Sequence, residues 1–113
     1  MKEEKRKVLF VCTANQQRSP TAERMYRDDP RFEVRSAGTE ALMGREITAD
    51  DLLWADMVIV MEERHERKIR SRFPKEIGGV ELIVLGIPDI YRQMEPALQR
   101  EIRDRFEPVV GDL

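Results

Sequence analysis

The sequence predicts an α/β fold, an open four-stranded parallel sheet with helices on both faces. Short apolar runs alternate with amphipathic segments along the whole chain, which is the pattern of repeated strand–helix units. One of these runs, Met57–Met61, is apolar without interruption, as expected for a parallel strand covered on both sides. No repeat or low-complexity linker divides the 113 residues, so we expect one domain over residues 1–113.

Four segments have the length and composition of strands, and they are Lys7–Val11, Phe32–Ser36, Met57–Met61 and Val80–Leu85. Each is short and rich in apolar residues, and a helical or turn-forming segment follows it. The order predicts that every strand returns to the sheet through a crossover, which makes the strands parallel.

The helices are predicted from caps and from apolar spacing. Ser19 caps the first helix with Pro20 at its first position, and the helix runs to about Arg27. A capping-box pair, Thr48 and Asp51, opens a short second helix. The third helix covers residues 62–73. Pro96 opens the last helix, and four apolar residues at a spacing of four form its stripe: Met94, Leu98, Ile102 and Phe106.

The composition excludes several classes of protein. Charged residues make up 37% of the chain and the net charge is -2, so nothing drives it toward nucleic acid or an anionic membrane. One cysteine and one histidine exclude a disulfide scaffold and argue against a zinc site within one chain. No apolar run has the length of a signal peptide or a membrane span, and we therefore expect a cytoplasmic protein.

The topology predicts a functional site at the edge of the sheet where the strands end. In open α/β sheets, ligands bind beyond the carboxyl ends of the strands. The residues directly after the four predicted strands are Cys12, Ser36-Ala37-Gly38, Glu62-Glu63 and the segment 86–91. A thiol, a hydroxyl and an acidic side chain that are distant in sequence would therefore share one cleft.

The most informative segment is residues 8–20, VLFVCTANQQRSP, which contains Cys-x5-Arg-Ser-Pro between a strand and a helix. A loop that closes on a helix N-terminus directs backbone N–H groups inward, and such a concavity binds a tetrahedral oxyanion and stabilises a thiolate. Cys12 is then a nucleophile, and the planar guanidinium of Arg18 holds two phosphoryl oxygens. Ser19 can donate to the sulfur, and Asn15 suits a position with positive φ.

Three further residues have more than one interpretation. Cleavage of a phosphate ester needs a proton for the departing oxygen, and Asp89 after the fourth strand is the best general acid, although a solvated turn aspartate is the commoner fate. His65 lies on one helical stripe with Ile69 and Phe73, which favours a residue at the edge of the core. Glu62 and its charged neighbours are most simply an exposed, salt-bridged face.

At these residues the chain resembles the low-molecular-weight protein tyrosine phosphatase family, whose signature is Cys-x5-Arg-Ser between a strand and a helix. The resemblance extends to Ser36–Thr39, to Ala55–Glu62 and to Asp89-Ile90-Tyr91, where the family usually has Asp-Pro-Tyr. It implies that Cys12 carries a phosphocysteine intermediate and that Asp89 acts first as acid and then as base. It also implies a supporting hydrogen-bond network and a phosphate-binding loop: the network contains Asn15, Ser19 and Ser36, and the loop contains Thr13, Ala14, Asn15, Gln16, Gln17, Arg18 and Ser19.

Three functions follow from this interpretation. The first is a cysteine-dependent phosphatase for aryl phosphate monoesters, with protein phosphotyrosine as the favoured substrate and a small aryl phosphate as the other. It is expected to use no cofactor or metal and to bind no nucleic acid or membrane. The second is an arsenate reductase that uses an external thiol. The third is a phosphate- or phosphopeptide-binding module without turnover, which is favoured by the departures from the family pattern at Ala14, Gln17 and Ile90.

Overall fold

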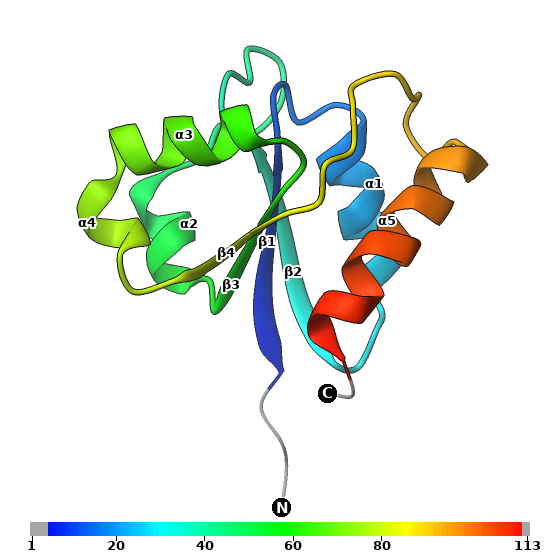
Figure 1. Ribbon diagram of the computed structural model, residues 1–113, viewed down its shortest axis with the longest axis horizontal. Coiled ribbons are helices and arrows are strands. Elements are labelled where there is room, and N and C mark those ends of the chain that lie inside the picture. Colours follow the sequence, from blue (N-terminus) through cyan, green and yellow to red (C-terminus); the bar gives the residue numbers. More distant parts are fainter. Residues whose placement is uncertain (1–4, 112–113) are drawn as a thin grey trace, which may run out of the picture.

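The computed structural model describes residues 5–111 and contains the predicted parallel sheet (Figure 1). Its strands are β1 (Arg6–Cys12), β2 (Phe32–Gly38), β3 (Met57–Val60) and β4 (Glu81–Val84). They are ordered β2-β1-β3-β4, and every neighbouring pair is parallel. The predicted fold class is confirmed, and β1 lies inside the sheet with its carboxyl end at the centre of the edge where the loops gather.

Helices cover both faces of this sheet. They are α1 (Arg18–Tyr26), α2 (Ala49–Trp54), α3 (Glu63–Arg72), α4 (Pro74–Ile77) and α5 (Pro96–Val110). Figure 1 shows α1 and α5 on one side of the sheet and the other three helices on the opposite side. Among the described residues, no helix is long and apolar enough to cross a membrane.

The pleat of β1 divides its side chains between two apolar cores. Val8 and Phe10 pack with α1 and α5, where the ring of Phe106 lies 5.2 Å from that of Phe10, centroid to centroid. Leu9 and Val11 pack on the other face with residues of α2 and α3. This alternation sends the next side chain, Cys12, to the face of α1. The period of the strand therefore decides which helix contacts the thiol.

Helix starts were predicted with mixed success. The capping box of α2 is confirmed, because the side chain of Thr48 accepts from the N–H of Asp51 and the Asp51 carboxylate accepts from the N–H of Thr48. The predicted cap at Ser19 is wrong. Helix α1 begins at Arg18, and Gln17 stands at its N-cap without a side-chain hydrogen bond. The hydroxyl of Ser19 is not free to cap because it contacts the thiol and the strand beside it.

The last helix also begins differently from its predicted stripe. Pro96 is its first residue as predicted, but Met94 lies before it, with a positive φ of 62°, and is not part of the stripe. Leu98, Ile102 and Phe106 are fully buried, and Val110 continues their line. Helix α4, a single turn that Pro74 opens after α3, was not predicted from the sequence.

Candidate active site

The predicted loop lies where the sequence placed it. Cys12 is the last residue of β1 and Arg18 is the first of α1, so residues 13–17 connect them directly. Both side chains are buried, with 3% of Cys12 and 1% of Arg18 exposed. The Sγ atom of Cys12 lies 3.0 Å from Oγ of Ser19, which accepts a hydrogen bond from Asn15 and can donate to the carbonyl of Ala37. The hydroxyl of Ser19 can therefore accept from a thiol or donate to a thiolate.

The first two peptide units of the loop have a fixed orientation. The carbonyl of Cys12 accepts from the N–H of Thr39 at 3.0 Å, and the carbonyl of Thr13 accepts from the N–H of Glu40 at 2.8 Å. In a trans peptide the carbonyl and the following N–H point in opposite directions. The N–H groups of Thr13 and Ala14 are therefore turned away from the segment 39–40, toward the other side of the loop. Successive N–H groups oriented together form an anion-binding concavity.

A single amide side chain supports the loop from inside. Asn15 has the positive φ that the sequence predicted, 56°, and its Nδ2 donates to Oγ of Ser19 and to Oγ of Ser36, both at 3.0 Å. Its Oδ1 accepts from the N–H of Arg45 at 2.9 Å. Ser36 in turn donates to the carboxylate of Glu23. The three predicted supporting residues are thus in contact, and Asn15 ties together α1, β2 and the segment after β2.

The guanidinium of Arg18 is hydrogen-bonded through its two Nη atoms but not through Nε. Its Nη1 donates to Oε1 of Glu62 at 2.8 Å and to the carbonyl of Ile87 at 2.7 Å, while its Nη2 lies 3.5 Å from Oγ1 of Thr13. Its Nε is buried and has no hydrogen-bond acceptor among residues 5–111. An unpaired buried donor is costly, so this nitrogen marks a place where an anion would be bound.

Glu62 lies in the candidate site, and its contacts differ from those expected from the sequence. It was assigned to an exposed, salt-bridged face, but its carboxylate accepts from both Arg18 and Arg64. Burial alone would raise the pKa of Glu62, but these hydrogen bonds outweigh burial and hold its pKa below the usual range. Its position after the third strand already placed it at the edge of the sheet where the other site residues gather, but its charged neighbours favoured the exposed interpretation.

His65 is the second residue that sequence reasoning undervalued. Its predicted place at the core is confirmed, because 1% of it is exposed and Ile69, one turn later, is fully buried. Its ring also contacts the loop: Nδ1 accepts from the N–H of Glu62 at 3.0 Å, and Nε2 lies 2.8 Å from Oγ1 of Thr13. Burial, reinforced by the charge of Arg18, lowers the pKa of His65 to about 4, so the ring is neutral near pH 7.

Asp89 reaches the same site from the other side. Its side chain is half exposed, and its Oδ1 lies 3.8 Å from Nε of Arg18. We call residues 85–95 the acid loop. Its start is held where Ile87 accepts from Arg18, and its end is held where the N–H of Met94 donates to Oγ1 of Thr21 at 2.8 Å. The structure therefore brings together Cys12, Arg18 and Asp89.

The segments on either side of the phosphate-binding loop carry exposed apolar side chains. Leu42 and Met43 lie on the segment after β2, and Ile90 lies on the acid loop. Gly44 lets the first segment approach closely, because a Cβ atom at this position would lie 2.7 Å from the carbonyl oxygen of Ala14. Apolar surface therefore borders the site on two sides.

Known proteins are similar to this chain in both sequence and fold. A family model for low molecular weight phosphotyrosine protein phosphatase matches residues 7–51. The low molecular weight protein-tyrosine-phosphatase Wzb of Salmonella typhimurium is 34% identical over 127 aligned positions, which cover 91% of this chain and 83% of that protein.

Two solved structures extend the similarity to the fold. The crystal structure of the tyrosine phosphatase Wzb from Escherichia coli K30 in complex with phosphate superposes with a TM-score of 0.75 at 24% identity, covering 90% of this chain and 94% of that one. The YwlE arginine phosphatase from Geobacillus stearothermophilus superposes with a TM-score of 0.65 at 25% identity, covering 93% and 88%. By its sequence identity to Wzb over most of both chains, this chain belongs to the low-molecular-weight protein tyrosine phosphatase family.

Proposed function

We propose that this chain hydrolyses phosphotyrosine in proteins through a phosphocysteine on Cys12. The observation that carries the proposal is the buried Nε of Arg18, which has no hydrogen-bond acceptor among residues 5–111 and lies 3.8 Å from the carboxylate of Asp89. An oxyanion bound there would accept from this nitrogen and from the backbone N–H groups of the loop. The phosphate in the Escherichia coli Wzb structure supports the same assignment for this chain.

In the first step, the thiolate of Cys12 attacks phosphorus on the side opposite the tyrosyl oxygen. The sulfur–phosphorus bond forms as the phosphorus–oxygen bond breaks, and the protonated carboxyl of Asp89 gives its proton to the departing phenolic oxygen. Arg18 and the loop N–H groups stabilise the charge on the equatorial oxygens. The products are a tyrosine side chain and a phosphocysteine.

In the second step, the carboxylate of Asp89 removes a proton from a water molecule that attacks phosphorus. The phosphorus–sulfur bond breaks, inorganic phosphate forms, and Cys12 leaves as a thiolate. Ser19 lies 3.0 Å from the sulfur and can donate a hydrogen bond to it, which makes the thiolate a better leaving group. Asp89 ends this step protonated and ready for the next substrate.

The surroundings of the site favour an aryl group on a protein. The exposed side chains of Leu42, Met43 and Ile90 offer apolar surface to an aromatic ring. Beside the site, a hollow of about 620 Å³ between the start of α3 and the acid loop is lined by charges of both signs, including Glu63 and Arg67. Such a surface suits the polar side chains that flank a phosphorylated residue in a peptide.

The test compares the wild type with Cys12→Ser and Asp89→Asn. We expect the wild type to hydrolyse p-nitrophenyl phosphate and a phosphotyrosine peptide, Cys12→Ser to have no turnover, and Asp89→Asn to be slowed about 10²-fold. Inorganic phosphate binding, measured by calorimetry, should persist in Asp89→Asn. Phosphate binding without turnover by the wild type would instead indicate a binding module, and a preference for a phosphoarginine peptide would overturn the aryl substrate.

A further inference from the structure

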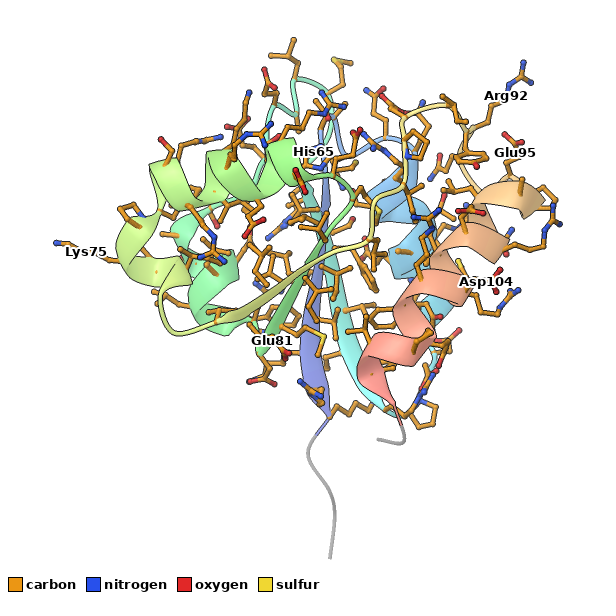
Figure 2. All side chains as sticks on the ribbon, in the orientation of Figure 1. His65, Lys75, Glu81, Arg92, Glu95 and Asp104 are labelled. Atoms are coloured by element: carbon orange, nitrogen blue, oxygen red, sulfur yellow. The ribbon has the colours of Figure 1, made fainter. Side chains whose placement is uncertain are left out.

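We propose that His65 is a positioning residue of the phosphate-binding loop, which it holds in its oxyanion-binding geometry through the side chain of Thr13. This inference rests on the proposed function, because it assigns a role in that same site. Figure 2 shows His65 at the end of α3 nearest the centre of the molecule, beside the loops at the carboxyl ends of the strands. The side chain is buried, and the proposed reaction steps do not use it.

The hydrogen bonds of His65 define which ring nitrogen carries the proton. Nδ1 faces the backbone N–H of Glu62 at 3.0 Å, and because that group can only donate, Nδ1 must be the acceptor. A neutral imidazole then carries its proton on Nε2, which donates to Oγ1 of Thr13 at 2.8 Å. The low pKa of His65 agrees with this single tautomer.

Thr13 is the first residue after Cys12, and it is fixed from two directions. Its carbonyl accepts from the N–H of Glu40, and its hydroxyl accepts from His65. These two contacts hold the backbone at the point where the strand becomes the loop. A rotation of Thr13 would turn the N–H of Ala14 away from a bound oxyanion, so the donor on His65 protects the geometry of the loop.

Residues at and beside the start of α3 also hold the guanidinium of Arg18 through two contacts. Glu62 accepts from Nη1, and Thr13, once held by His65, presents its hydroxyl oxygen 3.5 Å from Nη2. Both contacts act on the Nη atoms, and they fix the orientation of Nε, which has no hydrogen-bond acceptor in the described part of the chain and faces Asp89. Removing the donor of His65 should therefore weaken oxyanion binding more than proton transfer by Asp89, which lies on another loop.

The experiment measures inorganic phosphate affinity and the kinetics of p-nitrophenyl phosphate hydrolysis in two matched pairs of variants. His65→Leu removes the donor, and His65→Gln restores an N–H at similar reach. Thr13→Val removes the hydroxyl, and Thr13→Ser restores it. We expect the dissociation constant of phosphate to rise about tenfold in His65→Leu and in Thr13→Val, with most of this loss recovered in the two restoring variants.

A double variant distinguishes a positioning role of His65 from a general effect on stability. The two single changes break one shared hydrogen bond, and each also removes one further contact, from Glu62 to His65 or from Arg18 to Thr13. His65→Leu combined with Thr13→Val should therefore weaken phosphate binding by clearly less than the sum of the two single effects. The control is Ile69→Val, a buried change on the same helix that does not touch the loop, and it should leave phosphate affinity unchanged while lowering the melting temperature.

Three results would overturn the inference. They are unchanged phosphate affinity in Thr13→Val, full additivity of the two changes, and an equal loss of affinity in Ile69→Val. If His65→Leu does not fold, the pair Thr13→Val and Thr13→Ser still decides the question. Failure of the proposed function would be recognised separately, because the wild type would then bind phosphate without hydrolysing p-nitrophenyl phosphate.

Discussion

The phosphate-binding loop and the acid loop meet at the same site, but the protein holds them very differently. The phosphate-binding loop is bonded from three directions: Asn15 donates to Ser36 of β2, the N–H groups of Thr39 and Glu40 donate to its first carbonyls, and His65 contacts Thr13. The acid loop is hydrogen-bonded near its two ends, at residues 85–87 and at Met94. Between these anchors 73% of Ile90 is exposed, and the side chain of Asp89 is half exposed.

The proposed function gives each loop a different task, and this agrees with the difference. Stabilising a charged transition state needs donors that are already in place, because reorienting them during the reaction costs free energy. A carboxyl group that first gives and then takes a proton must serve a leaving group and later a water molecule, so a fixed position would suit only one step. We infer that the first loop is built for rigidity and the second for adjustment.

The largest expected effect comes from Arg18→Lys, which removes contacts that both loops share. A lysine ammonium cannot bond Glu62 and the carbonyl of Ile87 while also offering a planar fork to an oxyanion. We expect kcat/KM for p-nitrophenyl phosphate to fall about 10³-fold, together with phosphate affinity. Steady-state kinetics with phosphate as inhibitor checks this. A fall of less than tenfold would mean that Arg18 is structural and that the loop N–H groups bind the oxyanion alone.

The second prediction uses pH to distinguish the two loops, because only the network of the phosphate-binding loop contains a buried histidine. The pKa of His65 is about 4 in the folded chain and about 6.5 when unfolded, so the unfolded state takes up a proton first as pH falls. Stability is therefore complete above pH 6.5 and falls by about 3 kcal/mol on approaching pH 4.

Urea unfolding of the wild type and His65→Gln between pH 7 and pH 4.5 measures this loss of stability. Carboxylates contribute to both proteins alike, so the difference between the two curves isolates the only histidine of the chain. The wild type should lose more stability than the variant over this range. Parallel curves would show that His65 titrates normally in the folded protein and is not buried as described.

The third prediction concerns the inner support of the phosphate-binding loop. Asn15→Ala removes the amide that bonds Ser19, Ser36 and Arg45, and it places a Cβ-bearing residue without a local hydrogen bond at positive φ. We expect a loss of about 2 kcal/mol in the free energy of unfolding and a phosphate dissociation constant about tenfold higher.

Asn15→Gly is the matched control, because glycine accepts positive φ but lacks the amide. It should recover about 1 kcal/mol of stability relative to Asn15→Ala and none of the phosphate affinity. Equal stability of the two variants would show that backbone strain at this position is negligible. Normal phosphate affinity in either would contradict the supporting role of the amide.

The smallest expected effect tests the looser loop. Thr21→Val keeps the shape of the side chain but removes the oxygen that accepts from the N–H of Met94, so the end of the acid loop loses its hydrogen bond to α1. The same change removes the hydroxyl that donates to the carbonyl of Gln17, but this carbonyl still accepts from the N–H of Thr21. We therefore expect kcat to fall about fivefold with a smaller change in phosphate affinity. Thr21→Ser restores the oxygen and should behave as the wild type. Equal losses of kcat and phosphate affinity would contradict the separation of the loops.

Much of this site could be predicted because it is local. Cys12, Asn15 and Arg18 lie in one segment between a strand and a helix, and the alternation of apolar runs places the strands. Asp89 could be found because parallel strands end at the same edge. The cap at Ser19 was mispredicted for a local reason as well, since propensity favours the hydroxyl as a cap and cannot register that Cys12 and Ala37 compete for it.

The sequence by itself determined the sheet, the loop between β1 and α1, and the family signature, because spacing and period act between neighbours along the chain. Only the tertiary structure decided that Arg18 is buried against Glu62, 44 residues away, and that His65 holds Thr13 across 52 residues. The local sequence around a charged helix residue does not show whether its side chain faces water or a partner side chain. Which it faces depends on the packing of α3 beside the end of β1, and that packing is settled by the whole core.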